Sequence, residues 1–295
     1  MKKKYFVLLT AFFFCSSLYA QDLKKDYQQL RNKETEEKIL LKYLEKWQKE
    51  QPKDPEMFIA FSNFYFSKSH NEIVRLDTKP GKENNFEMTD SAGNKGYMYS
   101  EIYFTDSLIT KAYNYLSMAL LHNPSRLDIY FGQAYMLQET KNYTAQSLRI
   151  INIINKFYTT PTGWLWTDNK PCENMPDLFT GSIYRYCTGF FKAEQDSLVI
   201  AVSDAMIKVF PKDVRFYSMA GSSYAANKKY REAVSYYEKA IAIDPKDVIV
   251  LHNLAYVSML LPDKEKAMLY YNEILKYGNE EDKEEAKKRI QELKE

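Results

Sequence analysis

The sequence predicts an all-α fold, a helical-repeat solenoid with a small β-containing insert. Three observations indicate it. Prolines recur at a spacing of about 34 residues, as between Pro211 and Pro245. Small residues recur at fixed places between the prolines, where paired helices must approach each other closely. The helical pattern lapses in two stretches, 68–105 and 159–178, and both stretches lengthen the proline spacing.

The first twenty residues have the layout of a secretory signal peptide. Three lysines at positions 2–4 precede an apolar run over 5–14, and Ala20 stands before the polar Gln21. The run is shorter than the roughly 20 residues that span a bilayer, so an uncleaved anchor is the lesser alternative. We expect cleavage after Ala20 and a periplasmic or secreted protein.

The charge of the chain excludes a strongly basic protein. Loss of residues 1–20 removes three lysines and no acid, which leaves 38 basic against 39 acidic residues. Bulk charge therefore gives no support to nucleic-acid binding, and we expect no nucleic-acid partner. No later apolar run approaches membrane-spanning length, so we expect no transmembrane segment after cleavage.

The clearest repeat lies at 213–247. With Pro245 at position 32 of one unit, the remaining signature positions carry Tyr217, Ala220, Gly221, Tyr224, Ala233, Tyr237 and Ala240. Gly221, Ala233 and Ala240 are small where two helices must come within about 8–10 Å, and the tyrosines fill the spaces beside them. The segment resembles a tetratricopeptide repeat, a pair of antiparallel helices.

The same spacing extends the resemblance over most of the chain. The interval from Pro52 to Pro124 equals one repeat plus the length of the stretch 68–105. The interval from Pro124 to Pro211 equals two repeats plus about the length of the stretch 159–178. We therefore interpret these two stretches as inserts in an array of about six units, over 21–279.

Helices at 55–67 and 106–122 flank the first insert, which reads as a hairpin or three-stranded flap. Its expected strands, each bounded by turn residues, are 71–77, 85–90 and 96–104. At the C-terminus, 280–295 is a charged helix with a narrow apolar stripe, which is typical of a capping helix whose outer face meets water.

The resemblance is to exported tetratricopeptide proteins, and the layout with Gln21 after the cut is similar to those of Bacteroidetes. It implies a non-catalytic scaffold that holds an unidentified peptide or protein partner in a concave groove formed by the first helices. Ile59 and Asn63 fall in that groove but supply only half of a carboxylate clamp, which needs Lys at the place of Ile59. Its aromatic residues are Phe66, Phe131, Tyr135, Tyr184, Phe191 and Tyr256.

The second insert leaves an alternative function open. Trp164 and Trp166 lie outside the helical pattern, where they would stack on a sugar in a carbohydrate-binding module or fold back over the array as a plug. Cys172 and Cys187 remain after cleavage and could form a disulfide. The alternative is a buried free thiol at Cys187, because Cys187 occupies position 8 of its repeat, where a small residue packs between helices.

Catalytic patterns are missing. His70, His122 and His252 are far apart, and neither a metal-binding HExxH, a nucleophile elbow nor a phosphate-binding glycine loop occurs. A calcium loop over 90–101 has Lys95 where the turn glycine belongs. We therefore expect no enzyme activity, no cofactor and no metal.

Overall fold

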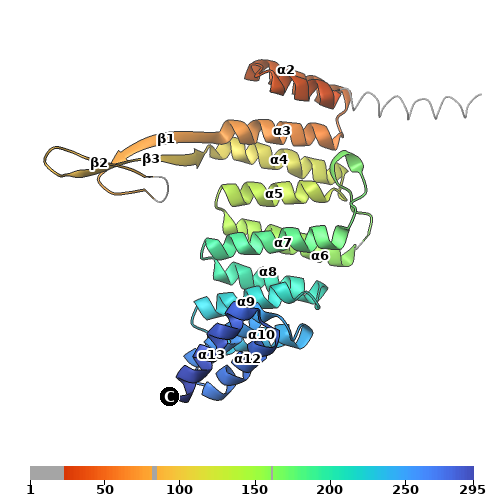
Figure 1. Cartoon of the computed structure of the whole chain (residues 1–295). Coiled ribbons are helices and arrows are strands. Elements are labelled where there is room, and N and C mark those ends of the chain that lie inside the picture. Colours follow the sequence, from red (N-terminus) through yellow and green to blue (C-terminus); the bar gives the residue numbers. More distant parts are fainter. Residues whose placement is uncertain (1–22, 82–84, 161) are drawn as a thin grey trace, which may run out of the picture. The chain divides into compact units, whose positions relative to one another are not determined.

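The computed structural model describes residues 23–81, 85–160 and 162–295 (Figure 1). The predicted signal peptide, 1–20, and its cleavage site lie outside the described residues. The predicted fold class is confirmed, because within each unit most consecutive helices contact each other and the described strands form one small three-stranded sheet. The described helices divide between two compact units.

Unit 1 contains the chain up to Lys141 and a returning segment, Trp164–Pro171. Residues 23–32 are helical. The further elements are α2 (Glu37–Glu50), α3 (Pro55–Ser69), β1 (His70–Asp77), β2 (Phe86–Thr89), β3 (Lys95–Phe104), α4 (Asp106–His122), α5 (Leu127–Glu139) and the 3-10 turn η1 (Thr167–Asn169).

The core of unit 1 forms where the predicted small and apolar positions meet. Leu44 and Trp47 of α2, Ala112 and Ala119 of α4, and Phe61 of α3 are buried together. Helix α3 begins at Pro55 because a proline is tolerated at the first helical position, and Asp54 caps it by accepting a hydrogen bond from the Glu56 amide.

The first insert extends the α3–α4 helix pair into a projecting antiparallel sheet with the order β1-β3-β2 (Figure 1). Strand β1 follows α3 directly, and β3 leads into α4 through Thr105. The Thr105 amide donates to the Ser69 carbonyl over 2.9 Å and closes the root of the sheet. The strands lie within one residue of the predicted bounds.

Unit 2 is a stack of helices from Asn142 onward, except for the segment that returns to unit 1. Its helices are α6 (Tyr143–Thr159), α7 (Met175–Lys192), α8 (Asp196–Val209), α9 (Val214–Ala226), α10 (Tyr230–Ile243), α11 (Val248–Leu260), α12 (Lys264–Tyr277) and α13 (Glu280–Lys294). Helix α7 begins inside the stretch that was predicted as insert, 159–178. The reason is Pro176, which sits in the first turn of the helix, where its missing amide hydrogen is not needed.

Helix α13 occupies the predicted capping segment. Asn279 and Asp282 form a reciprocal capping box at its start. Ala286 is buried, and Ile290 and Leu293 pack against the core of unit 2. Over the described residues, no helix combines the length and the apolar composition needed to cross a membrane.

Candidate functional site

A cleft opens in unit 1 between α3 and α5. Its cavity measures about 130 Å³. Three of the predicted groove residues on α3 contribute to its wall, together with Tyr135 on α5. The complete lining is Ile59, Ser62, Asn63, Phe66, Leu116, Asp128, Ile129, Gly132, Tyr135 and Met136.

Aromatic rings form the rim of this cleft. The Phe66 ring meets the Tyr135 ring edge to face, with 6.1 Å between centroids, and stacks on Phe104 at 5.7 Å. Phe104 is the last residue of β3, so the root of the sheet continues the aromatic wall. Tyr135 keeps 48% of its surface exposed and is available to a ligand.

Two uncharged polar groups face the same cleft. Asn63 is an exposed carboxamide, which can both donate and accept a hydrogen bond. Desolvation raises the pKa of the Tyr135 phenol, and the nearby charge of Glu139 raises it further. The phenol therefore stays protonated at neutral pH, where it can donate a hydrogen bond at the rim.

Phe131 does not belong to the open part of the groove. Its side chain is only 8% exposed, and the ring of Trp166 lies against it with 6.2 Å between centroids. The prediction of Phe131 as an accessible groove residue is therefore wrong. The repeat period places Phe131 on the correct helix face, but it cannot show that the second insert returns to cover that face.

Trp164 is also buried, at 5% exposure, and its ring meets Tyr130 edge to face at 6.0 Å. This corrects the prediction of Trp164 as a platform for sugar binding, because a ring packed into the protein cannot stack on a ligand. Trp166 is half-buried against Phe131. The second insert is thus a plug at one end of the cleft.

Backbone pairing fixes this plug to the start of α5. The Leu165 amide donates to the Ser125 carbonyl over 2.8 Å, and the Leu127 amide donates to the Leu165 carbonyl over 2.9 Å. The turn that follows contains Asp168 and Asn169, both with positive φ angles of 60° and 54°. Asp and Asn tolerate that conformation better than most residues.

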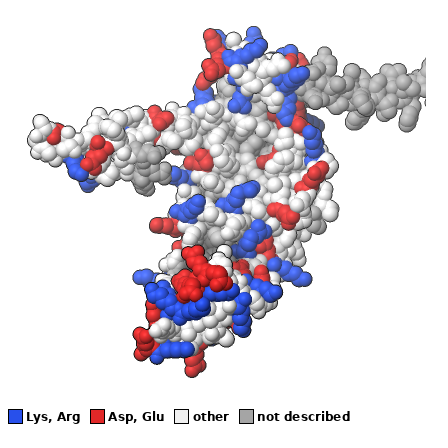
Figure 2. Space-filling view, in the orientation of Figure 1, with Lys and Arg blue, Asp and Glu red and all other residues white. Residues whose placement is uncertain are grey.

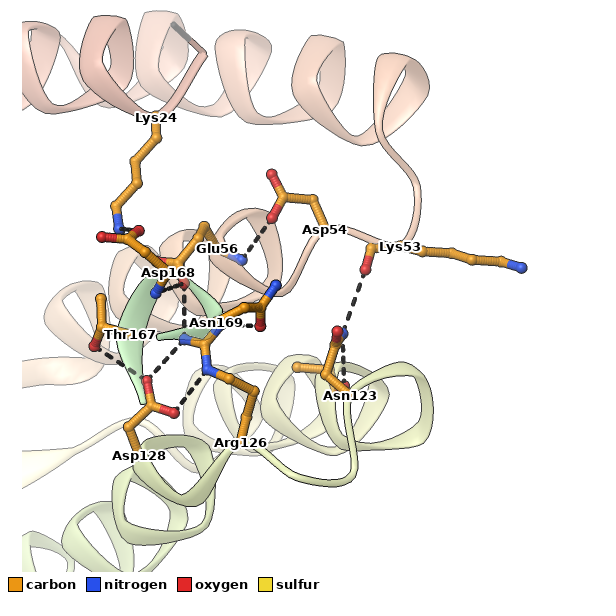
Figure 3. A network of polar contacts seen from close by, with 11 residues as sticks. Lys24, Lys53, Asp54, Glu56, Asn123, Arg126, Asp128, Thr167, Asp168 and Asn169 are labelled. Carbon is orange, nitrogen blue, oxygen red and sulfur yellow. Dashed lines mark hydrogen bonds and ion pairs between the residues drawn. The ribbon is translucent and has the colours of Figure 1, made fainter. Parts of the chain in front are cut away.

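A buried arginine holds the side chains of the same turn (Figure 3). Arg126 is 0% exposed, and its Nη2 donates to Glu56 Oε1 over 2.7 Å and to Asp128 Oδ2 over 2.8 Å. Its Nη1 donates to Asn169 Oδ1 over 3.1 Å. We call the set Lys24, Glu56, Arg126, Asp128, Thr167, Asp168 and Asn169 the Arg126 clasp.

Lys24 closes the clasp from the other side. Its Nζ lies 2.7 Å from Glu56 Oε2 and 2.5 Å from Asp168 Oδ1. Burial alone would raise the pKa of Glu56, but the hydrogen bond from Lys24 and the charge of Arg126 outweigh burial and lower it. The hydrogen bond from Lys24 likewise lowers the pKa of Asp168. At neutral pH the clasp therefore carries ionised carboxylates.

These carboxylates are neutralised by the chain itself. Glu56 faces Lys24 and Arg126, and Arg126 also pairs with Asp128. Within the described ranges no group of His, Cys, Asp and Glu side chains is arranged to hold a metal ion. The clasp therefore fastens the plug, and the cleft beside it is the candidate ligand site of unit 1.

The other predicted groove residues belong to unit 2. Tyr184 is half-buried, with its ring beneath the Arg215 guanidinium at 5.5 Å and edge to face with Phe216 at 6.4 Å. Phe191 on α7 and Tyr256 on α11 are 39% and 60% exposed. A continuous aromatic surface that joins these residues to Tyr135 stays a prediction.

The signature residues of 213–247 lie at the α9–α10 contact. Ala220, Ala233 and Ala240 are fully buried, Tyr217 and Tyr237 are nearly so, Tyr224 packs against the same core, and the exposed Pro245 follows the end of α10. A Cβ atom on Gly221 would lie 2.6 Å from the Tyr237 ring.

The structure decides between the two predictions for the cysteines, a disulfide or a buried free thiol. Cys172 and Cys187 are not joined by a disulfide. Cys187 is buried in α7, and burial raises the pKa of its thiol to about 12. A thiol that stays protonated behaves as a small packing group, which agrees with its place at a small-residue position.

Residues 214–247 match the family model of the tetratricopeptide repeat. These residues form a tetratricopeptide repeat. They cover α9 and α10, the tetratricopeptide pair in which Gly221 faces Tyr237. No curated protein matches the chain.

Several solved structures are similar to this chain at low sequence identity. YrrB, described as a TPR protein with an unusual peptide-binding site, is 15% identical, covers 83% of this chain and 97% of its own, and has a TM-score of 0.42. MamA from Desulfovibrio magneticus RS-1 is 17% identical over 57% of this chain and 84% of its own, with a TM-score of 0.37. A tetratricopeptide repeat protein from Parabacteroides merdae ATCC 43184 is 12% identical over 94% and 85%, with a TM-score of 0.36. With TM-scores below 0.5, these similarities support no inference about function.

No sequence pattern predicts the Arg126 clasp. Its members are spread from Lys24 to Asn169, and each is a residue type that normally lies on a solvated surface. One signal was available. Three small or polar residues follow Trp166 as Thr167-Asp168-Asn169, a composition that favours a tight turn and hence a return of the chain.

Proposed function

We propose that this chain is a non-catalytic scaffold that holds a peptide segment of a protein partner in the cleft of unit 1. One observation carries the proposal. Phe66 on α3 and Tyr135 on α5 lie edge to face beside a cavity of about 130 Å³, with the carboxamide of Asn63 at its wall. The family match at 214–247 supports a scaffold of the tetratricopeptide type.

The lining of the cleft indicates which peptides fit. Ile59, Phe66 and Met136 offer apolar contact, and the cavity has room for one apolar side chain of a ligand. Asn63 can hydrogen-bond the ligand's backbone, and the Tyr135 hydroxyl can do so at the rim. Because Asp128 is already paired with Arg126, the cleft selects for an uncharged side chain.

The plug sets one end of the binding site. Trp166 covers Phe131, so a ligand is confined to the part of the groove between Asn63 and Tyr135. A plug fastened by backbone pairing and buried charges keeps this end in one position before the ligand arrives. Such preorganisation lowers the entropic cost of binding.

The place of action is also part of the proposal. A basic start, an apolar run over 5–14 and Ala20 before a polar segment support export to the periplasm or the medium. Sequencing of the N-terminus of the chain purified from its native envelope fraction would test this. We expect Gln21 as the first residue, whereas an intact Met1 on cytoplasmic material would contradict export.

Selection from a random peptide library displayed on phage tests the binding function. Selected peptides are synthesised, and their affinity for the purified chain is measured by fluorescence anisotropy. We expect Tyr135→Ala to weaken binding at least about tenfold, the loss of roughly one buried aromatic contact. The matched control is Tyr158→Ala, a 67% exposed tyrosine on α6. Equal affinity of both variants would rule out the cleft as the site.

A further inference from the structure

The sheet of the first insert has two chemically different faces. Directly paired residues of an antiparallel sheet lie on the same face. Leu76 and Phe86 both pair with Met98, and Glu72 pairs with Ile102. Since side chains alternate along each strand, one face carries Val74, Leu76, Phe86, Met88, Met98 and Ile102, with Ser100 and Glu72 beside them. We call the six apolar residues the apolar sheet face.

The apolar sheet face is open to water. Its side chains are between 38% and 72% exposed, Met98 being the least and Leu76 the most. A large apolar side chain offers on the order of 150–200 Å², so the six leave roughly 600 Å² in contact with solvent. Monomeric proteins rarely expose a larger patch than this without a partner. In Figure 2 the projection is mostly white, with few charged groups.

The opposite face is mixed, with charged pairs beside Ile73 and the three tyrosines Tyr97, Tyr99 and Tyr103. Arg75 pairs with Glu101 across β1 and β3, and Lys95 lies 2.6 Å from Glu87 across β3 and β2. An antiparallel sheet with one polar and one apolar face ordinarily buries the apolar face against a second layer. The described residues of unit 1 provide such a layer only at the root, where Phe104 stacks on Phe66.

We propose that the missing layer is the same face of a second copy of this chain. None of the six side chains carries a charge. When the apolar sheet faces of two copies meet, these residues therefore cause no repulsion between like charges. Two copies would bury roughly 1,200 Å², the lower limit of a stable protein interface. A twofold axis satisfies both copies with one patch, and two sheets packed face to face form a β-sandwich.

The position of the patch favours this arrangement. Ile102 lies level with Glu72, and the other five residues lie farther from the root where the sheet joins α3 and α4. Two sheets can therefore overlap with their helices at opposite ends. Glu72 lies on the same side of the sheet at its root end, where it accepts a hydrogen bond from Ser100, so this overlap keeps the two copies of Glu72 apart.

Two other occupants fit the apolar sheet face less well. In a bilayer, the unpaired backbone groups of the edge strands β1 and β2 would lose water to hydrocarbon. A peptide strand added at an edge would satisfy those backbone groups but would leave the apolar sheet face exposed.

Adjacent residues of β3 supply a matched pair of variants. Ile102 lies on the apolar sheet face and is 56% exposed, and Tyr103 lies on the opposite face and is 47% exposed. Sedimentation-equilibrium measurements on the purified chain between micromolar and several hundred micromolar give the dimer dissociation constant. We expect a concentration-dependent dimer for the wild type, at least tenfold weaker association for Ile102→Lys, and a change within about twofold for Tyr103→Lys. Circular dichroism establishes that both variants keep the helical fold.

Three results would overturn the proposal. A wild-type chain that stays monomeric throughout the concentration range would exclude a second copy as the partner of the apolar sheet face. Equal weakening by Ile102→Lys and Tyr103→Lys assigns association to another surface or to loss of the sheet. Monomers that bind phosphatidylcholine vesicles, with binding lost in Ile102→Lys alone, assign the face to a lipid surface. Peptide binding by the cleft is measured separately, so none of these results bears on the proposed function.

Discussion

A glycine sets how closely helices α9 and α10 approach. A Cβ on Gly221 would lie 2.6 Å from Tyr237, and Tyr237 is only 2% exposed, so its ring has no room to yield. The role of Gly221 can be predicted from sequence because it belongs to the repeat pattern. Its position recurs between paired helices, and a side chain there must be small.

Gly221→Leu should therefore destabilise the chain by about 1–3 kcal/mol or more through overpacking. The control is Lys228→Ala, in the exposed turn between the same helices, which should change the free energy of unfolding by about 0.5 kcal/mol at most. Thermal unfolding followed by circular dichroism compares them. Equal melting temperatures would show that the helix pair is assigned the wrong register.

Arg126 is the opposite case, a residue whose importance depends wholly on tertiary structure. In the sequence it is an ordinary charged residue after a proline turn. In unit 1 it is 0% exposed and meets Glu56, Asp128 and Asn169. Because these partners come from three separate segments, no local pattern marks them as a set.

Arg126→Met should cost about 3–5 kcal/mol, since it leaves the buried carboxylates of Glu56 and Asp128 without their cation. Arg289→Met is the matched control, because Arg289 pairs with Glu292 on the exposed face of α13, and an exposed pair contributes about 1 kcal/mol or less. Denaturant unfolding measures both. A loss for Arg126→Met no greater than that of the control would mean that the clasp does not stabilise unit 1.

At the scale of elements, the two inserts differ in how well they were predicted. The first has strong strand patterns between turn residues, and its strands and flanking helices appear where the sequence indicates. The second has no periodic pattern. The composition around Pro176 predicts a loop, but Pro176 lies in the first turn of α7. The burial of Trp164 and the cover over Phe131 depend on a chain reversal that residue types alone do not fix.

The plug should respond to acid. A carboxylate whose pKa is lowered in the folded protein contributes stability at neutral pH, and this contribution is lost as pH falls through the folded pKa. Glu56 and Asp168 both titrate below their ordinary values of 4.5 and 3.8. The difference in unfolding free energy between wild type and Glu56→Gln should thus be largest near pH 7 and shrink as the pH falls below these ordinary values.

Denaturant titrations at a series of pH values, followed by tryptophan emission, supply this comparison. Glu280→Gln serves as the control, because the Glu280 side chain is 88% exposed and its difference from wild type should be small and nearly independent of pH. A difference for Glu56→Gln that grows on acidification would show that the carboxylate is not held ionised by Lys24 and Arg126.

At the scale of the whole molecule, stacked helical pairs make stability and binding local properties. Each pair in such an array contacts mainly its neighbours, so a ligand in the cleft of unit 1 should protect the helices that line it and few others. The fold class followed from the proline period. The location of an open cleft did not, because it depends on which groove positions the inserts cover and which they leave exposed.

Amide hydrogen exchange with and without a library-selected peptide measures this directly. We expect the peptide to slow exchange in α3 and α5, and in the plug segment Trp164–Pro171 beside them, while α10 and α12 keep their rates. The same peptide should give no protection in Tyr135→Ala at an equal concentration. Protection confined to the helices of unit 2, or unchanged protection in Tyr135→Ala, would contradict the cleft as the binding site.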